Sequence, residues 1–573
     1  MARVTGGEVL KRCLVEENVR YVFGVPGDQL YPVLDAFYED KSIEFVTMRH
    51  EAASAHAADG WARATGHPGV CLGTVGPGAA NLVGGVYAAF ADSIPMVVIT
   101  AQNQSWRSYP DHGSTQALDQ ISLFKAVTKW NSVVSHWKRI PELTERAFRT
   151  ATSGRPGPVH LDFPSDVLFQ TGQDSDLAIL HPPSYRPVVP SAGDAELVEE
   201  AARMILKAKS PLIHAGGGVL RSGASKELIE LAEYLQIPVT TSMSGRGAIP
   251  EDHPLCLIPG AFGSGALVAQ TGADAVLLVG GRLGDLEMWG QPPLAWGEPD
   301  HQKFIQIDIS GDMVGLNRRV DVGIVGDARS TLRALLEHVK RLTPKRTEAA
   351  SLAEYKQIEK RWLEGFEAQS RLDQVPIHPL RAIREAREFF PRDAISVVDG
   401  GNTTVWCLYL NRIYEPKTYL SCASGDSGHL GAGIPYAIAA KLAEPSRQVY
   451  CITGDGSFGF NIHELETAGR LKLPLTFLVE NDSAYGMIKS GQTLAYSKRY
   501  VGVDLGDIRY DKVAQAMNCY GERVTEPSEI KPALQRAADS RLPAVLDVVV
   551  DGAPIPPDFE VLASIWLEGC EIP

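Results

Sequence analysis

The sequence predicts an α/β protein of three domains, each a doubly wound parallel sheet. Short apolar segments alternate with helix-like segments along most of the chain, and many of the apolar segments end at a glycine-rich turn. A length of 573 residues suits about three domains that each bury a core of their own. The 54 glycines fit the tight strand-to-helix turns of such sheets.

The apolar segments place the strands and the domain limits. We expect a first domain at residues 1–185, a second at 195–345 and a third at 370–573. Between the first two, a stretch rich in Pro, Ser and Asp reads as a linker. The expected strands are 20–25, 43–48, 70–74 and 95–100, then 211–214, 275–279 and 304–308, then 395–398, 449–453 and 473–480. The tail 551–573 is either a lid over a site or a packed surface arm.

Composition excludes several classes of protein. The formal net charge of −14 argues against a general nucleic-acid binder, which needs a basic face. No apolar run is long enough to span a bilayer, and the start lacks the apolar core of a signal peptide. The eight scattered cysteines indicate reduced core residues. We therefore expect a cytoplasmic protein without membrane or nucleic-acid partners.

One stretch carries most of the chemistry. The apolar run 449–453 leads into Gly454, Asp455, Gly456 and Ser457, and the strand 473–480 leads into Asn481 and Asp482, with 24 residues between Gly456 and Asn481. Both turns should lie at the carboxyl edge of a parallel sheet, where ligands bind. Two carboxylates and a backbone carbonyl there would suit Mg²⁺, and the glycines would let the backbone approach a diphosphate. Gly-Asp-Gly alone would be an ordinary surface turn.

This spacing resembles the thiamine diphosphate-binding motif, Gly-Asp-Gly followed after 24 to 27 residues by Asn-Asn or Asn-Asp. The resemblance implies that Asp455, Asp482 and the carbonyl of Ala484 hold Mg²⁺, which in turn holds the diphosphate of the cofactor. Many members have Asn where this chain has Asp482.

Further stretches extend the resemblance to the family of acetohydroxyacid (acetolactate) synthases and pyruvate oxidases. Arg49-His50-Glu51 matches the segment that supplies the catalytic glutamate, whose carboxyl group binds the aminopyrimidine ring; alone, Glu51 would read as a first-turn helix residue. The other residues that the resemblance assigns to the site are Gly27 and Gln116 near the reacting carbonyl, Asn402, Thr403 and Met487 beside the cofactor, Gly428 facing its amino group, and Leu430 as the wedge beneath it.

The central domain also matches the family. Gly216-Gly217-Gly218, Gly281-Arg282 and Asp308-Ile309 follow strands at places where acetohydroxyacid synthases touch FAD. Without the resemblance they would be plain strand-to-helix turns, because no complete Gly-x-Gly-x-x-Gly is present. FAD, ADP or an empty pocket are all compatible with these turns.

The resemblance implies a thiamine diphosphate- and Mg²⁺-dependent enzyme that acts on small molecules, a 2-oxo acid such as pyruvate among them. Glycine stands at 491, where the synthases carry the tryptophan that selects the acceptor, and Leu286 replaces an arginine, so we expect a non-standard acceptor. The alternative is a 2-hydroxyacyl-CoA lyase or oxalyl-CoA decarboxylase type of enzyme. Because Glu51 and Asp455 lie in different domains, which in this family meet across a subunit interface, we expect a homodimer or homotetramer.

Overall fold

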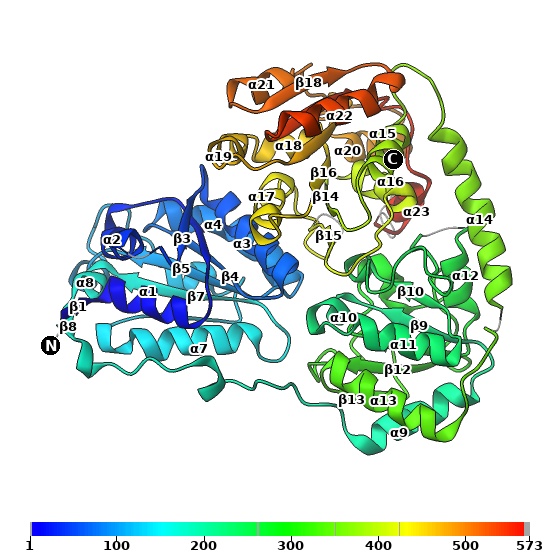
Figure 1. Ribbon diagram of the computed structural model, residues 1–573, viewed down its shortest axis with the longest axis horizontal. Helices are drawn as coiled ribbons and strands as arrows, with labels where there is room; N and C mark the ends of the chain where they lie inside the picture. Colours follow the sequence, from blue (N-terminus) through cyan, green and yellow to red (C-terminus); the bar gives the residue numbers. More distant parts are fainter. Residues whose placement is uncertain (1–2, 40, 261–262, 350, 423–424, 567–573) are drawn as a thin grey trace. The chain divides into compact units, whose positions relative to one another are not determined.

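Three parallel sheets organise the chain in the computed structural model, as the sequence predicted, and helices cover them (Figure 1). The structure describes residues 3–39, 41–260, 263–349, 351–422 and 425–566. Ser424, the first residue of the expected cofactor loop, and the last seven residues of the tail therefore lie outside the described residues. A short antiparallel pair, β1 (Arg3–Thr5) and β8 (Thr171–Gln173), accompanies the first sheet.

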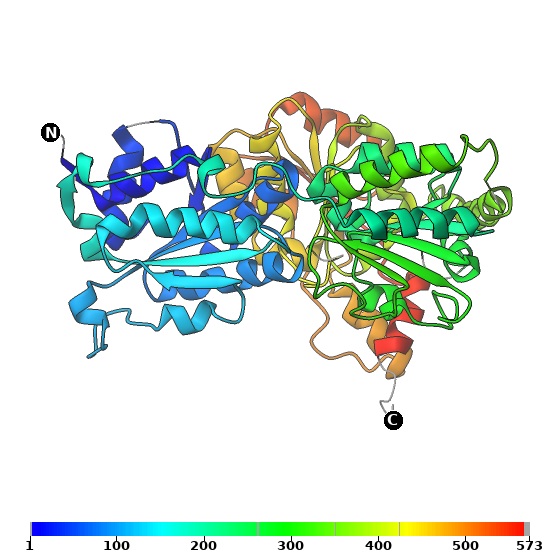
Figure 2. The same cartoon turned by 90° about the horizontal axis from the view of Figure 1, so that it is seen from below.

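The first sheet has six strands, most of them continuous runs of buried apolar residues, as expected where helices cover both faces. Their order across the sheet is β3 (Glu44–Thr47), β2 (Tyr21–Gly24), β4 (Gly69–Gly73), β5 (Met96–Gln102), β7 (Pro158–Pro164) and β6 (Trp130–Val133). α1 (Gly6–Glu16) packs with α7 (Ile140–Thr152), and α3 (Glu51–Thr65) packs with α4 (Pro77–Ala91) on the other face (Figure 2). The strand order reverses between β2 and β4.

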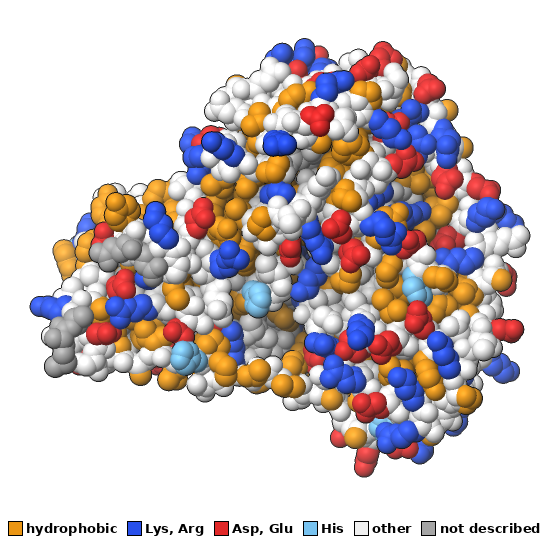
Figure 3. Space-filling view, in the orientation of Figure 1, with side chains coloured by type: hydrophobic (Ala, Val, Ile, Leu, Met, Phe, Trp, Pro, Cys, Tyr) orange, Lys and Arg blue, Asp and Glu red, His pale blue; other side chains and the backbone are white. Residues whose placement is uncertain are grey.

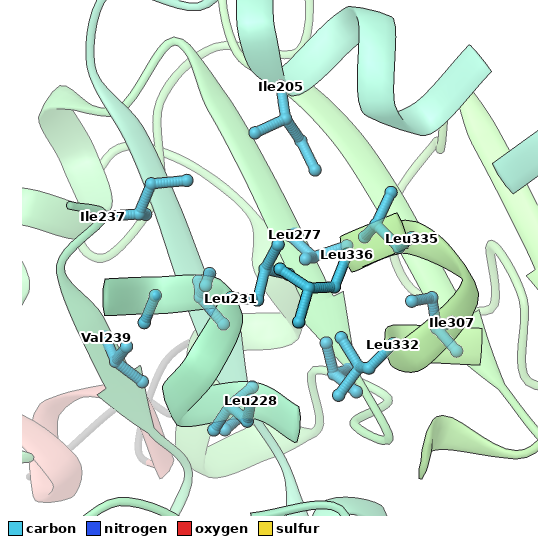
Figure 4. Close-up of a cluster of buried hydrophobic side chains, with 14 of the residues drawn as sticks. Ile205, Leu228, Leu231, Ile237, Val239, Leu277, Ile307, Leu332, Leu335 and Leu336 are labelled. Carbon is cyan, nitrogen blue, oxygen red and sulfur yellow. The ribbon is translucent and has the colours of Figure 1, made fainter. Parts of the chain in front are cut away.

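The central sheet has five parallel strands around its own core. Their order is β10 (Val239–Thr241), β9 (Pro211–Ala215), β11 (Ala275–Val279), β12 (Lys303–Asp308) and β13 (Val322–Val325). Leucines of α11 (Ser225–Leu235) and α13 (Ala328–Leu342) point toward Leu277 and Ile307 of the sheet (Figure 4). Burying each of these side chains stabilises the domain by about 1.5–3 kcal/mol. Here the order reverses between β9 and β11.

The third sheet repeats the topology of the first. Its order is β15 (Tyr419–Leu420), β14 (Ile395–Asp399), β16 (Val449–Gly454), β17 (Thr476–Asn481), β19 (Ala544–Val549) and β18 (Tyr520–Val524). The reversal lies between β14 and β16. In an open α/β sheet ligands bind at such a reversal, at the carboxyl ends of the strands. Within the tail, α23 (Pro557–Trp566) is helical.

Residue contacts divide the chain into two compact units that do not follow sequence order. One comprises Met1–Val189, Ser427–Pro445 and Asn461–Leu471, and the other comprises the rest. The first unit therefore contains α17 (Gly433–Ala443) and α19 (Glu464–Arg470) from the third sequence domain. α17 packs closely against α3.

Among the described helices, none has both the length and the apolar character that crossing a membrane requires. Lys and Arg side chains alternate with Asp and Glu side chains on the face shown in Figure 3, with no continuous basic area.

Candidate active site

The reversal in the first sheet brings two turns together. Gly27 follows β2 and Thr74 follows β4, and a Cβ on Gly27 would lie 2.3 Å from the Thr74 hydroxyl oxygen. That hydroxyl donates a 2.6 Å hydrogen bond to the side-chain oxygen of Gln29. Position 27 therefore admits only glycine, and this half-buried residue lies at the carboxyl edge of the first sheet.

Glu51 begins α3 directly after β3. His50 caps the helix through a 3.1 Å bond from the Ala52 N–H to its Nδ1. The carboxylate of Glu51 is buried, accepts a 2.9 Å hydrogen bond from Asn81 of α4 and faces Gly78, whose absent Cβ would lie 3.3 Å from Oε1. Asn81 thus orients Oε2 of Glu51, and the absence of a side chain at Gly78 leaves room beside Oε1.

Gln116 lies on an exposed loop with φ +62°. Gly76 is the residue before α4, and a Cβ added to it would lie 2.2 Å from the carbonyl oxygen of Gln116. The loop thus contacts the start of the helix whose Gly78 and Asn81 face Glu51. The first unit therefore places the Gln116 loop and Glu51 at the same end of α4.

Gly428 and Leu430 also belong to the first unit. Gly428 has φ +57° and an open space where a Cβ would be, so its backbone is accessible. Leu430 is half-buried, and its carbonyl lies 2.8 Å from Nδ1 of His429. The His429 ring packs edge-on against His56 of α3, at 4.6 Å between centroids. This contact fixes the loop against the helix that begins with Glu51.

The second unit brings two other turns together at the reversal between β14 and β16. A Cβ on Gly400 would lie 3.1 Å from the Gly454 nitrogen and 3.1 Å from the Ser457 hydroxyl. Asn402 and Thr403 begin α16 (Asn402–Leu410) after this turn. The Asn402 side chain donates a 3.0 Å bond to Ser490, while its Oδ1, although buried, has no hydrogen-bond partner. Hydroxyl, amide and backbone donors thus surround one edge of the sheet.

Asp455 and Asp482 lie directly after β16 and β17. Burial and the charge of Asp482 raise the pKa of Asp455, and burial raises the pKa of Asp482. Oδ2 of Asp455 is buried and has no hydrogen-bond partner, while the carbonyl oxygen of Ala484 lies 3.6 Å from the place of a Cβ on Gly456. Asp455 is buried and Asp482 is half-buried, and two adjacent carboxylates in such a place are unfavourable unless a cation or a proton offsets their charge.

This pair of carboxylates fits a hard divalent cation. Mg²⁺ is held by one or two carboxylates together with phosphate oxygens and water, and it does not need a cage of protein side chains. In keeping with this, the described residues contain no cluster of three or more His, Cys, Asp and Glu side chains placed to hold a metal. The uncompensated Asp455 oxygen is the observation that supports the fit.

Met487 follows on α20 (Gly486–Ala495). Met487 packs over Gly401, because a Cβ added to Gly401 would lie 2.7 Å from the Cβ of Met487. Tyr485 covers Gly456 in the same manner, at 2.8 Å. The glycines of the two turns therefore make room for these neighbouring side chains.

The turns of the central sheet are engaged with one another. A Cβ on Gly216 would lie 2.2 Å from the carbonyl oxygen of Gly280, and the Gly218 N–H donates a 2.9 Å bond to that oxygen. Arg282 forms an ion pair with Asp426, and Asp308 accepts a 3.0 Å bond from the Ser310 N–H. The close approach of two backbones therefore requires glycine at these positions.

Sequence reasoning missed three buried polar side chains near these turns. Glu464 accepts hydrogen bonds from the Arg49 and His50 N–H groups, at 2.9 and 3.2 Å, just before Glu51. Gln120 accepts one from Gly76. Glu480 lies at the end of β17, where burial raises its pKa to about 8. The one available signal was Glu480, an acidic residue that closes an otherwise apolar strand.

Comparison with protein families matches the same three regions. The chain carries the N-terminal TPP-binding domain of thiamine pyrophosphate enzymes at residues 4–123, the central domain at 198–335 and the C-terminal TPP-binding domain at 399–548. It belongs to the thiamine pyrophosphate enzyme family. The C-terminal match contains the Asp455 and Asp482 turns, and the N-terminal match contains Glu51 and Gln116.

Relatives extend over nearly the whole chain. A probable acetolactate synthase large subunit of Methanocaldococcus jannaschii is 36% identical, over 96% of this chain and 92% of its own. The acetolactate synthase large subunit of Corynebacterium glutamicum is 35% identical over 96% and 87%. A mitochondrial acetolactate synthase catalytic subunit of Aspergillus candidus is 33% identical over 96% and 80%. This thiamine pyrophosphate enzyme is therefore acetolactate synthase-like, a carbon–carbon bond-forming transferase.

Proposed function

We propose that this enzyme is a thiamine diphosphate- and Mg²⁺-dependent carboligase that takes a 2-oxo acid such as pyruvate as its donor. The observation that carries the proposal is the pair of adjacent carboxylates, buried Asp455 and half-buried Asp482, with an unpartnered Asp455 oxygen beside the glycine turns of the third sheet. Asp455, Asp482 and the carbonyl of Ala484 would hold Mg²⁺. The acetolactate synthase names of the relatives favour this activity over cleavage of CoA thioesters.

Thiamine diphosphate supplies a carbon acid that, once deprotonated, adds to carbonyl groups and accepts the electrons released by decarboxylation. Gly454, Gly456, Ser457, Asn402 and Thr403 would bind its diphosphate through backbone and side-chain donors, with Met487 packed beside them. Gly428 would accept a hydrogen bond from its amino group at the backbone carbonyl, and Leu430 would support the cofactor from below.

Glu51 would hold and exchange the proton at the aminopyrimidine nitrogen. Its burial excludes water from the carboxyl group, and Asn81 fixes one of its oxygens. Gln116 and the backbone of Gly27 would orient the substrate carbonyl.

Two residues bear on the acceptor. A side chain at Gly491 would extend toward Phe559 of α23, whose Cζ lies 3.8 Å from the absent Cβ. We propose that this space, together with Leu286, admits an acceptor other than the 2-oxo acids of acetolactate synthesis. Replacement Gly491→Trp should fill the space and lower the turnover of larger acceptors more than that of pyruvate.

We also propose that the active enzyme is a homodimer or homotetramer, in which the domains of two subunits complete each cofactor site. Sedimentation of the enzyme during turnover tests this, and an active monomer would contradict it. Cofactor extraction from purified protein distinguishes FAD, ADP and an empty central domain. The mutual contacts of Gly216, Gly218 and Gly280 favour a central domain without a nucleotide phosphate on that turn.

The first experiment is proton NMR of the enzyme with thiamine diphosphate, Mg²⁺ and pyruvate. Formation of acetolactate or acetoin would support the proposal, and Glu51→Gln should abolish it while the cofactor still binds. Untouched pyruvate would remove pyruvate as the donor. Near-native turnover by Glu51→Gln would refute the role of this glutamate.

A further inference from the structure

A buried network of side chains holds the loop 113–119, which carries Gln116. At the end of β5, the amide nitrogen of Gln102 donates a 3.0 Å hydrogen bond to the Leu118 carbonyl, and that of Asn103 donates a 2.8 Å bond to the Thr115 carbonyl. These bonds lie on either side of Gln116. The main chain on both sides of the exposed Gln116 is therefore held by hydrogen bonds from buried side chains.

Gln120 connects this loop to the rest of the first sheet. Its Oε1 accepts a 2.8 Å bond from the Gly76 N–H. Its Nε2 donates to Asp162 Oδ1 at 2.6 Å and to the Thr100 hydroxyl at 3.0 Å. Gln120 is 1% exposed and Asp162 is fully buried, so water does not compete for these bonds.

Gly76 is the point at which the loop and α4 meet. It has φ +67°, and a Cβ there would lie 2.2 Å from the Gln116 carbonyl oxygen. α4 begins at the next residue and carries Gly78 and Asn81, which face Glu51. A displacement of the Gly76 backbone would therefore alter the distance between Gln116 and Glu51.

We propose that Gln120 is a positioning residue that sets Gln116 relative to Glu51 through its bond to Gly76. The inference rests on the proposed function, in which Gln116 and Glu51 act on the same substrate. Gln120 itself touches neither the substrate nor the cofactor. Its loss would displace the Gln116 loop, and a displacement of about 1 Å lowers turnover by up to about 100-fold.

A buried glutamine can also serve the core alone, and the chain offers a matched control. Gln302 in the central domain is 2% exposed, donates to the carbonyls of Gln270 and Ala273 at 2.7 and 2.9 Å, and accepts a 3.1 Å bond from the Gly297 N–H. Gln302→Leu removes three hydrogen bonds of a buried glutamine, against four in Gln120→Leu, from a part of the chain without a role in the proposal.

The decisive measurement is a double-mutant cycle on the holoenzyme. Gln120→Leu should lower kcat by about 10–100-fold while KM for the donor stays within about threefold. In a Gln116→Ala background, adding Gln120→Leu should lower kcat by a further factor of less than about two, because the effect of Gln120 passes through Gln116. An equal fold loss in both backgrounds, or the same kcat loss in Gln302→Leu, would overturn the proposal.

Hydrogen–deuterium exchange tests the same inference without turnover. Peptides covering 113–119 should exchange faster in Gln120→Leu and at the wild-type rate in Gln302→Leu; unchanged exchange in Gln120→Leu would overturn the proposal. If Gln120→Leu does not fold, Asn103→Leu tests the same coupling. A wild-type enzyme that converts no 2-oxo acid would refute the proposed function alone, because the exchange measurement needs no substrate.

Discussion

We expect the ionisation of Glu464 to make the stability of the first unit depend on pH, and the substitution Glu464→Gln to remove this contribution. The side chain is fully buried and accepts hydrogen bonds from Arg49, His50 and Thr467, yet burial raises its pKa from 4.5 to about 7. The folded protein therefore binds this proton more tightly than the unfolded chain. Its contribution to stability is present below pH 4.5 and is lost as the pH rises through 7.

The size of the effect follows from the shift. A difference of about 2.5 pKa units corresponds to about 3 kcal/mol of unfolding free energy. For a unit of some 200 residues this is roughly 6 to 12 °C in melting temperature. Glu464→Gln keeps an acceptor for the two backbone N–H groups and does not ionise, so its melting temperature should rise relative to that of the wild type as the pH is raised.

Melting curves of both proteins between pH 5 and pH 8, at one scan rate, measure this difference. Other ionisable groups cancel, because the two chains share them. Glu466→Gln is the matched control, since Glu466 lies two residues away, is partly exposed and pairs with Arg470. Parallel melting temperatures for wild type and Glu464→Gln across this range would refute the reasoning.

Three further predictions concern other residues. Asp455→Asn should weaken Mg²⁺-dependent binding of thiamine diphosphate by more than about 100-fold in calorimetric titration, whereas the exposed Asp539→Asn should not; equal affinities would remove Asp455 from the metal site. Gly78→Ala puts a methyl group 2.9 Å from Thr74 Cγ2 and 3.3 Å from Glu51 Oε1, so it should cost about 1–3 kcal/mol of stability and lower turnover. Arg63→Leu leaves Asp59 and Asp92 buried without their cation, at a cost of about 3–5 kcal/mol; the exposed Arg203→Leu should cost less than about 1 kcal/mol. Melting temperatures check the stability changes predicted for Gly78→Ala, Arg63→Leu and Arg203→Leu.

The local sequence pattern was sufficient to predict the fold and the turns at the strand ends. Apolar runs identified β14, β16 and β17, the first two followed by glycine and the third by Asn481 and Asp482, and parallel strands necessarily bring their carboxyl ends to one edge. That rule alone placed Asp455 and Asp482 near each other. The roles of these residues and of Glu51 came from the resemblance to the family and stay predictions.

Contacts between distant segments left no local signal. Glu464 bonds to His50 across 414 positions, and nothing around Glu464 distinguishes it from a glutamate in the first turn of a surface helix. Gln120 likewise reads as an ordinary polar residue until Gly76 and Asp162 are placed around it. In the central domain, the contact of Gly216 and Gly218 with Gly280, another close approach of distant segments, also left no local signal.

The packing of α17 against α3 imposes an order of events on biosynthesis. Tyr436 bonds to Asp59, a buried carboxylate 377 positions earlier in the chain, and the same helix face carries Arg63. At 5–20 residues per second, a ribosome needs roughly 20–75 s to add the residues between them. During that interval the nascent N-terminal segment holds a charged helix face whose covering helix has not yet been made.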